Sequence, residues 1–126
     1  MPAPLAIFDR IISDRGSVYA VSGAPVADRA EIDARLAELK SARRFAKATH
    51  NSWAARLGGE GLKADDGETG AGAIILRMLE SEGLTGHLVI VTRWYGGKHL
   101  GGDRFRHVIG AVRHYLAHRP RSGGGN

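Results

Sequence analysis

The chain has 126 residues, no cysteine and a net charge of +5, from 18 basic and 13 acidic side chains. This length suits one domain, which we place at residues 1–120 with a flexible tail at 121–126, and the 43% hydrophobic content can form a core without disulfides. The absence of cysteine excludes thiol nucleophiles and the usual zinc fingers. No apolar run approaches the about 20 residues of a membrane helix, so we expect a cytoplasmic monomer without a membrane partner.

The positive charge is concentrated at the C-terminal end of the chain. Residues 93–126 contain seven basic side chains and one acidic side chain, Asp103, which amounts to +6, whereas residues 1–92 amount to −1. Such an asymmetry favours an anionic partner. It is equally compatible with a basic helix that is simply solvated, and charge alone does not separate the two interpretations.

The N-terminal part of the chain predicts two strands followed by a helix. Residues 5–12 and 17–22 have the composition of strands, and the polar residues 13–16 between them indicate a turn. Asp28 begins a capping-box pattern ahead of an apolar stripe with helical spacing. This pattern predicts a helix over residues 29–42.

The middle of the chain predicts a strand, a second helix and a central strand. Residues 45–57 fit no clean period, and we interpret them as a strand that ends at a glycine-rich break at 58–61. Residues 67–82 carry an apolar stripe of helical spacing. Residues 88–92 are apolar on both faces and mostly β-branched, which indicates a strand at the centre of the sheet.

A glycine-rich loop at 96–102 leads into the last predicted helix, which Asp103 caps and which runs to about residue 118. The predicted core stripe of this helix is Phe105, Val108, Ile109, Val112 and Leu116, and the residues expected to point outward are Arg106, Arg113, His107, His114 and His118. The resulting order, ββαβαβα, favours the α/β class, with one sheet on which the helices pack.

An acidic cluster, Asp65, Asp66 and Glu68, precedes the second predicted helix. Three neighbouring carboxylates can bind Mg²⁺ or supply an acid or a base. They can also cap the helix and complement its dipole, with Gly67 in a left-handed conformation. His50 is a candidate general base oriented by Asp66, although a hydrogen-bonded structural histidine is the more common outcome.

The loop between the central strand and the last helix has the arrangement of an anion site, because backbone N–H groups and the helix dipole point outward there. Arg93, Lys98 and Arg104 add side-chain donors suited to phosphate. Alternatively, Gly96 and Gly97 serve a tight turn beside the sheet.

Two further residue groups carry chemistry in principle. Trp94 and Tyr95 follow Arg93, and we expect one aromatic ring to be buried and the other to be exposed. His114 and His118 are four residues apart and could form a metal pair, but a solvated helix face explains them without a third ligand. We therefore expect no metal and no cofactor.

Four stretches together resemble the conserved domain of the IMPACT/YigZ family, from about residue 15 to residue 116. The Gly-Asp-Arg-Phe ending of the last stretch is more similar to the eukaryotic IMPACT branch than to the bacterial one. The stretches are Ala48-Thr49-His50-Asn51, Asp65-Asp66-Gly67-Glu68-Thr69, Arg93-Trp94-Tyr95-Gly96-Gly97 and Leu100-Gly101-Gly102-Asp103-Arg104-Phe105.

This resemblance implies an α+β two-layer sandwich, as in a domain of small-subunit ribosomal protein five and of elongation factor G. It also implies a non-enzymatic role in translation. Eukaryotic IMPACT proteins compete for the activator of the general-control kinase that responds to amino-acid starvation, and they associate with ribosomes and actin. Nucleic-acid binding has been proposed for the bacterial relatives.

The sequence departs from the family pattern in a few places. Ala55 stands where a tyrosine is common, Gly102 stands where IMPACT proteins usually have proline, and Lys98-His99 make the loop more basic than usual. Eukaryotic members also carry an RWD domain and bacterial members a small ferredoxin-like domain. We expect the 126 residues to contain the shared domain alone.

Three functional hypotheses follow. In the first, a non-enzymatic translation-related domain contacts RNA or the ribosome through the glycine-rich loop and the last helix. In the second, the domain binds only a protein, such as the general-control kinase activator, with Trp94 and Tyr95 as hot spots. In the third, the acidic cluster holds Mg²⁺ for an enzyme acting on a phosphorylated substrate. The residues expected to bind are Arg93, Trp94, Tyr95, Gly96, Gly97, Lys98, Arg104, Arg106 and Arg113, and the polar cluster of the family motif is His50, Asn51, Asp65, Asp66 and Glu68.

Overall fold

The computed structural model describes residues 3–121, so residues 122–126 of the predicted tail lie outside the described part. Five strands form one sheet in the order β1-β2-β5-β3-β4, and every neighbouring pair is antiparallel. The elements are β1 (Ala6–Asp14), β2 (Ser17–Pro25), α1 (Arg29–Lys40), α2 (Arg43–Ala46), β3 (His50–Leu57), β4 (Glu60–Ala64), α3 (Ala71–Glu82), β5 (His87–Trp94) and α4 (Asp103–His118).

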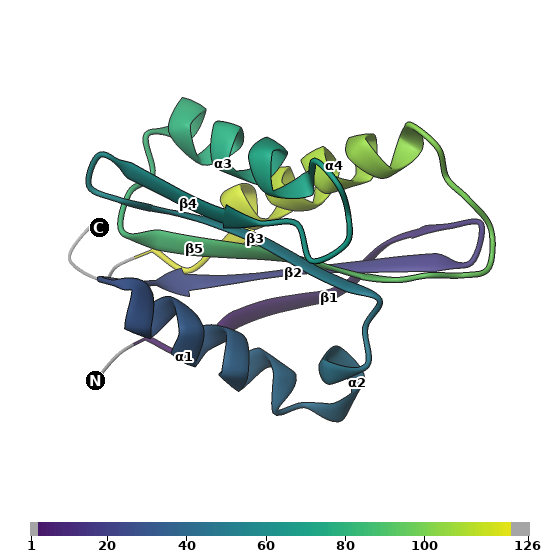
Figure 1. Ribbon diagram of the computed structural model, residues 1–126, viewed down its shortest axis with the longest axis horizontal. Helices are drawn as coiled ribbons and strands as arrows, with labels where there is room; N and C mark the ends of the chain where they lie inside the picture. The colour runs from purple at the N-terminus through teal and green to yellow at the C-terminus, as the bar shows by residue number, and fades with distance from the viewer. Residues whose placement is uncertain (1–2, 122–126) are drawn as a thin grey trace.

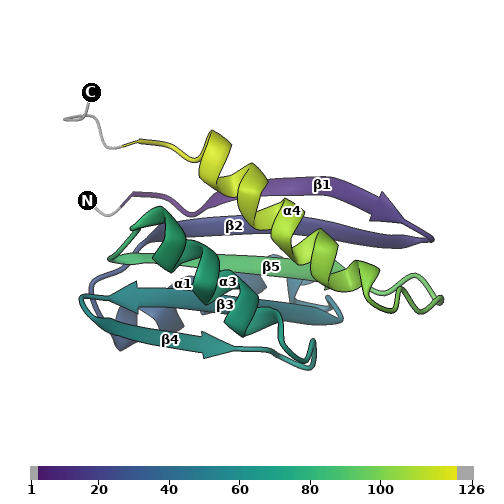
Figure 2. The ribbon, with the colours of Figure 1, turned by 90° about the horizontal axis from the view of Figure 1, so that it is seen from above.

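Helices cover both faces of this sheet. Helices α3 and α4 lie side by side on one face, and α1 and α2 lie on the other (Figures 1 and 2). The predicted mixed α/β fold is therefore confirmed, and the sheet with α3 and α4 provides its two main layers. The core between these layers includes Tyr19, Val21, Ile75, Leu79, Val108, Val112 and Tyr115.

Strand β5 occupies the centre of the sheet, as its composition predicted. It pairs with β2 on one side and with β3 on the other. Val89 and Val91 face α3 and α4, whereas Leu88 and Ile90 face the core under α1. Burial on both faces explains why this strand is apolar at consecutive positions.

One of the two hairpins of the sheet was predicted from the sequence, and the other was missed. The β1–β2 hairpin turns at Arg15 and Gly16, which both have positive φ, so the predicted turn is confirmed. The β3–β4 hairpin turns at Gly58 and Gly59. The glycine-rich break at 58–61 is therefore a tight turn that leads into an additional edge strand, β4. The sequence did not predict β4, because this strand is short and contains a glycine.

The interpretation of residues 45–57 as one strand is wrong at its beginning. Residues Arg43–Ala46 form the short helix α2, and β3 begins at His50. Phe45 is buried in the core under α1 and contacts the Trp94 ring edge-on at 5.1 Å. This tertiary contact, rather than a local period, determines the conformation of the segment.

Helix α3 begins at Ala71, four residues later than predicted. Asp66, Gly67 and Gly70 all have positive φ, so the preceding chain forms turns instead of helix. Gly67 adopts the predicted left-handed conformation. The helix ends at Gly83, whose φ of 69° is the left-handed conformation that glycine commonly supplies at a helix C-terminus.

Helix α4 spans the predicted residues, but its buried face is rotated relative to the prediction. Phe105, Ile109 and Leu116 are only partly buried, and Gly102 rather than Asp103 occupies the cap position. The helix crosses β1, β2 and β5 and also packs on α3, so its contacts cover more than one narrow stripe. The residues that it buries are His107, Val108, Ala111, Val112 and Tyr115.

His107 is therefore not on the solvent side, as expected, but in contact with the neighbouring hairpin. Its Nε2 lies 2.8 Å from a carboxylate oxygen of Asp14, and its ring lies 5.3 Å from that of Tyr19. His114 and His118 stack on each other at 4.2 Å beside Phe8. Arg106 and Arg113 are exposed, as predicted.

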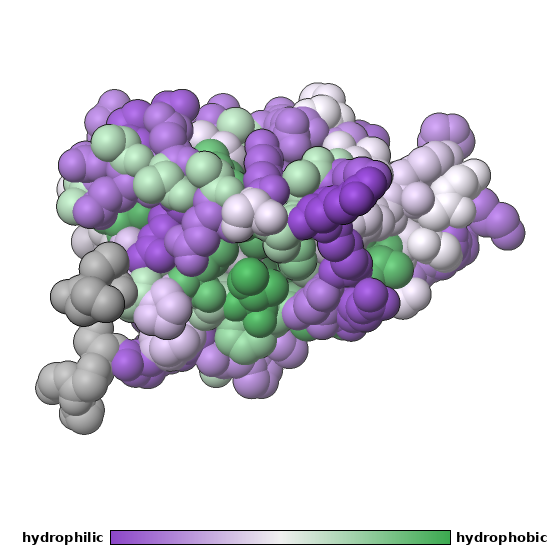
Figure 3. Space-filling model, turned by 90° about the horizontal axis from the view of Figure 1, so that it is seen from below, coloured by the Kyte–Doolittle hydropathy of each residue, from purple (hydrophilic) through white to green (hydrophobic). Residues whose placement is uncertain are grey.

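The face that carries α1 leaves part of the sheet accessible. Figure 3 shows apolar atoms gathered at the centre of this face, between hydrophilic margins. Ile7 of β1 pairs with Ser22, faces this side and is 45% exposed. Within residues 3–121, no helix is long and apolar enough to cross a membrane.

Candidate functional site

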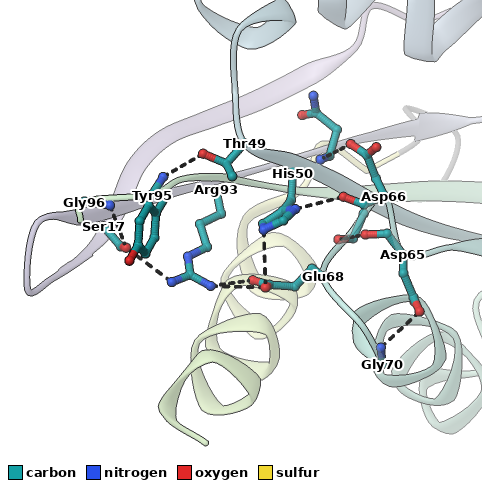
Figure 4. Close-up of polar contacts among 12 residues, drawn as sticks. Ser17, Thr49, His50, Asp65, Asp66, Glu68, Gly70, Arg93, Tyr95 and Gly96 are labelled. Carbon is teal, nitrogen blue, oxygen red and sulfur yellow. Dashed lines mark hydrogen bonds and ion pairs between the residues drawn. The ribbon is translucent and has the colours of Figure 1, made fainter. Parts of the chain in front are cut away.

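The polar motifs of the sequence meet where β3 begins and β5 ends. Strand pairing places His50 opposite Arg93, and the loop before α3 brings Glu68 to the same point (Figure 4). We call His50, Glu68 and Arg93 the buried cluster. Because its members come from three separate segments, the cluster depends on the order of strands in the sheet.

An ion pair forms the centre of the buried cluster. Nη1 of Arg93 donates to both carboxylate oxygens of Glu68, at 2.9 and 3.1 Å. Arg93 and Glu68 are only 5% and 4% exposed, and Nη2 of Arg93 lies 3.4 Å from the Ser17 hydroxyl. Arg93, predicted as a donor to an external anion, therefore has an internal partner that neutralises its charge.

His50 is held by the backbone rather than by the carboxylate that was expected to orient it. Its Nδ1 lies 2.8 Å from the carbonyl oxygen of Asp66 and donates a hydrogen bond to it, because a carbonyl oxygen can only accept. Nε2 consequently points toward Glu68, at 3.6 Å from the carboxylate. A Cβ on Gly67 would approach the His50 ring to 3.0 Å, so glycine allows the loop to pass close to the imidazole.

The two aspartates of the acidic cluster organise the chain around them. The carboxylate of Asp65 accepts hydrogen bonds from the N–H groups of Gly70 and Gly72, at 3.0 and 2.8 Å, which caps the start of α3. These bonds hold the pKa of Asp65 below its usual value. The carboxylate of Asp66 accepts from the N–H of Asn51 at 2.7 Å.

Asn51 is also a structural connector. Its side-chain oxygen accepts from the Thr92 hydroxyl at 2.7 Å, and its amide donates to the carbonyl of Phe45 at 3.1 Å. The carboxylates of the acidic cluster thus have different protein partners. Within residues 3–121, no group of three His, Cys, Asp or Glu side chains has the arrangement of a metal site. These contacts favour the structural interpretation of the acidic cluster over the Mg²⁺ interpretation.

The glycine-rich loop is built as a tight turn. A Cβ on Gly96 would lie 2.0 Å from the backbone of Gly16, so the loop and the β1–β2 turn touch at this point. The N–H groups of Tyr95 and Gly96 donate to the hydroxyls of Thr49 and Ser17. Ser17 and Thr49 were not among the predicted site residues, although Thr49 belongs to the first family stretch.

The first N–H groups of α4 are also occupied by the chain itself. Those of Asp103, Arg104 and Phe105 donate to the carbonyls of residues 100, 101 and 102 at 3.1 to 3.4 Å. The backbone here is consequently not an open cradle for an anion. Gly97, with φ of 91°, and Lys98 lie on the exposed part of the loop.

The expectation that one aromatic ring is buried and the other exposed holds in part, because Tyr95 is exposed and Trp94 is partly buried. The Trp94 ring packs on Phe45, its Nε1 donates to the carbonyl of Arg44 at 3.0 Å, and the Arg44 guanidinium stacks 3.7 Å from its centroid. Tyr95 is 44% exposed. Of the two residues, Tyr95 is therefore the one available to a partner.

Two hollows flank these elements. One is a pocket of about 300 Å³ beside the buried cluster, whose polar lining is His50, Glu68, Arg93, Tyr95, His99 and Arg104. The other is a shallow groove of about 600 Å³ on the outer side of α4, lined by Ile12, Arg106, His107, Ile109, Gly110 and Arg113. Sequence reasoning missed His99 as a pocket residue, because nothing local connects it with His50.

Arg106 and Arg113 lie two turns apart on the outer side of α4. Arg106 has a side chain that is 69% exposed and a loose ion pair with Asp103 at 3.4 Å. Together with Lys98 in the preceding loop, they form what we call the basic surface. Five of the seven basic residues of the C-terminal quarter are thus divided between the buried cluster, the pocket wall and the basic surface, and Arg119 and Arg121 follow α4.

The chain shares its fold with solved structures. The crystal structure of a hypothetical protein superposes with a TM-score of 0.79 at 24% identity, and the alignment covers 93% of this chain and 59% of that one. A two-domain translational regulator, Yih1, superposes with a TM-score of 0.55 at 32% identity, covering 90% of this chain and 46% of that one.

Curated relatives share the sequence. Protein IMPACT of Mus musculus is 37% identical over 114 residues, which span 86% of this chain and 36% of the relative. The IMPACT homologue of Saccharomyces cerevisiae is 36% identical over 108 residues, which span 81% and 42%. The chain thus covers less than half the length of the relatives it matches. The model of the Impact N-terminal domain family matches residues 15–116, and the chain belongs to this family.

Proposed function

We propose that this domain regulates translation by binding RNA or the ribosome through the basic surface. The structural relative Yih1 is described as a translational regulator, and this supports a role in translation for the present domain. The observation that carries the mode of action is the exposure of Arg106 and Arg113 along one groove of α4, while Arg93 is engaged by Glu68. A row of exposed guanidinium groups suits successive phosphates of an RNA backbone.

A binding role fits the polar motifs better than catalysis does. The carboxylates of Asp65, Asp66 and Glu68 accept hydrogen bonds from protein groups, and His50 has its Nδ1 bound to a carbonyl. These contacts build a scaffold that supports the loop from which the basic surface begins. The motif residues are therefore proposed to act on binding through the shape of that loop.

The test is binding of ribosomes or a ribosomal RNA fragment at several salt concentrations. The double variant Arg106→Ala/Arg113→Ala is expected to weaken binding and to lower the slope of log affinity against log salt by about 2, one for each lost phosphate contact. The matched control is Lys40→Ala/Lys47→Ala, which removes two exposed charges from the α1 and α2 side. Equal effects of the two double variants, or binding independent of salt, would rule out the basic surface.

A second candidate is a protein partner, such as an activator of the general-control kinase. The observation that favours it is Tyr95, an exposed ring beside the pocket. Capture from a lysate with and without ribonuclease separates the candidates: partners that survive ribonuclease indicate protein contact. In that case Tyr95→Ala should weaken binding by about 2 kcal/mol, as expected for an aromatic hot spot.

A further inference from the structure

The pocket beside the buried cluster has the composition of a small-molecule site. It holds about 300 Å³ and lies between the loop before α3, the end of β5 and the start of α4. Its polar lining contains two arginines, two histidines and one carboxylate. It is distinct from the groove on the outer side of α4 that lies along the basic surface.

The donors in this pocket outnumber the acceptors. Both oxygens of Glu68 accept from Arg93, so the one carboxylate of the lining is already paired with a guanidinium. Both Nη atoms of Arg93 have protein partners, Glu68 and Ser17, and its Nε–H is buried beneath the pocket surface. Arg104 lines the pocket and is partly exposed, so it is the guanidinium whose Nη donors can reach a ligand.

A lining with two guanidinium groups, two imidazoles and one paired carboxylate favours an anion rich in oxygen acceptors. A phosphoryl group matches this need, because it offers several charged oxygens to a planar guanidinium. The pocket volume exceeds what a lone phosphate requires. Tyr95, whose ring lies 6.0 Å from that of His99, provides a flat and exposed surface for an attached ring.

We infer that this pocket binds a phosphomonoester carrying a flat ring, of the kind found in a nucleoside 5′-monophosphate. The phosphoryl group faces Arg104, and the ring lies against Tyr95. The same chemistry occurs in a free nucleotide and at the 5′ end of an RNA chain. This inference does not rest on the proposed function, because Arg106 and Arg113 are not part of the pocket.

The test is titration of the full ¹⁵N-labelled chain with uridine 5′-monophosphate, with uridine as the reference ligand. The expected result is that the monophosphate shifts the amide signals of Gly67, Tyr95 and Gly101, all in the pocket lining, and that uridine does not. Arg104→Gln should weaken binding about tenfold, the value of one charge-assisted hydrogen-bond contact. Lys40→Gln is the matched control, because it removes an exposed charge from α1, outside both the pocket and the basic surface, and it should leave the affinity unchanged.

Three results would overturn the inference. The first is no shifts up to about 10 mM nucleotide, a range that includes weak affinities. The others are equal shifts with uridine and its monophosphate, and equal losses in Arg104→Gln and Lys40→Gln. Circular dichroism of each variant checks that it is folded.

If the monophosphate binds, oligonucleotides with a 5′-phosphate and with a 5′-hydroxyl identify the source. Preference for the 5′-phosphorylated oligonucleotide indicates an RNA end, and preference for the mononucleotide indicates a free metabolite. RNA binding through the basic surface can fail while the pocket titration succeeds, so the two proposals fail separately.

Discussion

The buried cluster and the basic surface are both rich in charge, and both take arginines from the C-terminal quarter of the chain. Arg93 and Arg106 are thirteen residues apart, yet one is 5% exposed and paired with Glu68, whereas the other projects into solvent with a side chain 69% exposed. The positive side chains in this part of the chain therefore serve two different purposes. Arg93 holds segments of the fold together, whereas Arg106 is available to a partner.

The comparison also explains why the family stretches are rich in polar residues. Hydrogen bonds of 2.7 to 3.0 Å join Asn51 of β3 to Asp66 in the loop before α3 and to Thr92 of β5, and join Asp65 of that loop to the start of α3. Such bonds fix the loops that approach the pocket. The residues that are most specific in sequence are thus mainly structural, and the candidate contacts lie next to them.

The largest expected effect is a difference in stability between a variant of the buried cluster and a variant of the basic surface. Glu68→Ala leaves the Arg93 guanidinium buried without its partner, which should lower the free energy of unfolding by about 3–5 kcal/mol. Arg106→Ala, in the basic surface, should change it by less than about 0.5 kcal/mol. Urea denaturation followed by circular dichroism measures both. A loss below about 1 kcal/mol in Glu68→Ala would show that the buried cluster is not structural.

A second prediction extends the comparison to histidines. His87 is buried, lies 2.5 Å from the Tyr115 hydroxyl, and has its pKa lowered by burial to about 4 from 6.5. The unfolded chain therefore binds the proton more readily than the folded chain. Stability should be complete above pH 6.5 and fall as the pH drops toward 4, by about 1.4 kcal/mol per pH unit and about 3 kcal/mol in all.

Denaturation measured between pH 7 and pH 4.5 tests this dependence. The window lies above the range of Asp14 and Asp65, whose pKa values stand below the usual 3.8 because of their hydrogen bonds. His87→Gln keeps a polar side chain without the titration and should flatten the curve. His99→Ala, at an exposed position away from His87 and His114, should leave it unchanged. An equally steep curve in His87→Gln would assign the effect to other groups, among them His114, whose pKa burial also lowers.

The smallest of these effects distinguishes the adjacent aromatic residues. Trp94→Ala removes the ring that packs between Phe45 and Arg44 and should destabilise the fold by about 2 kcal/mol. Tyr95→Ala should change stability by less than about 0.5 kcal/mol, because its ring is largely exposed. Thermal unfolding of the two variants measures the difference. If the two variants had similar melting temperatures, the Trp94 ring would not stabilise the core. Trp94 would then again be a candidate contact for a binding partner.

Local patterns predicted most of the fold because several elements carry strong signals of their own. The Arg15-Gly16 turn, the Asp28 cap and the apolar run of β5 are each determined within a few residues. The cap is confirmed in detail, since the Asp28 side chain accepts from the N–H of Glu31 at 2.9 Å. Strand β4 and helix α2 escaped prediction because both are short and depend on neighbours for their conformation.

The candidate site was predictable in composition but not in arrangement. The motif residues His50, Glu68 and Arg93 were identified, yet their mutual contacts need β5 to insert between β2 and β3. That order is a long-range property, and no local period encodes it. The same holds for His107, which the helical pattern placed outside and which contacts with the β1–β2 hairpin bury.

The sequence by itself determined the class of fold, the family stretches and the concentration of positive charge after Arg93. It could do so because turns, caps and apolar runs act over a few residues, and because net charge is a sum that does not depend on folding. Only the tertiary structure decided which of those charges are internal. Burial depends on which segments meet, and pairing of the Arg93 guanidinium with Glu68 rather than with solvent follows from the arrangement of the sheet.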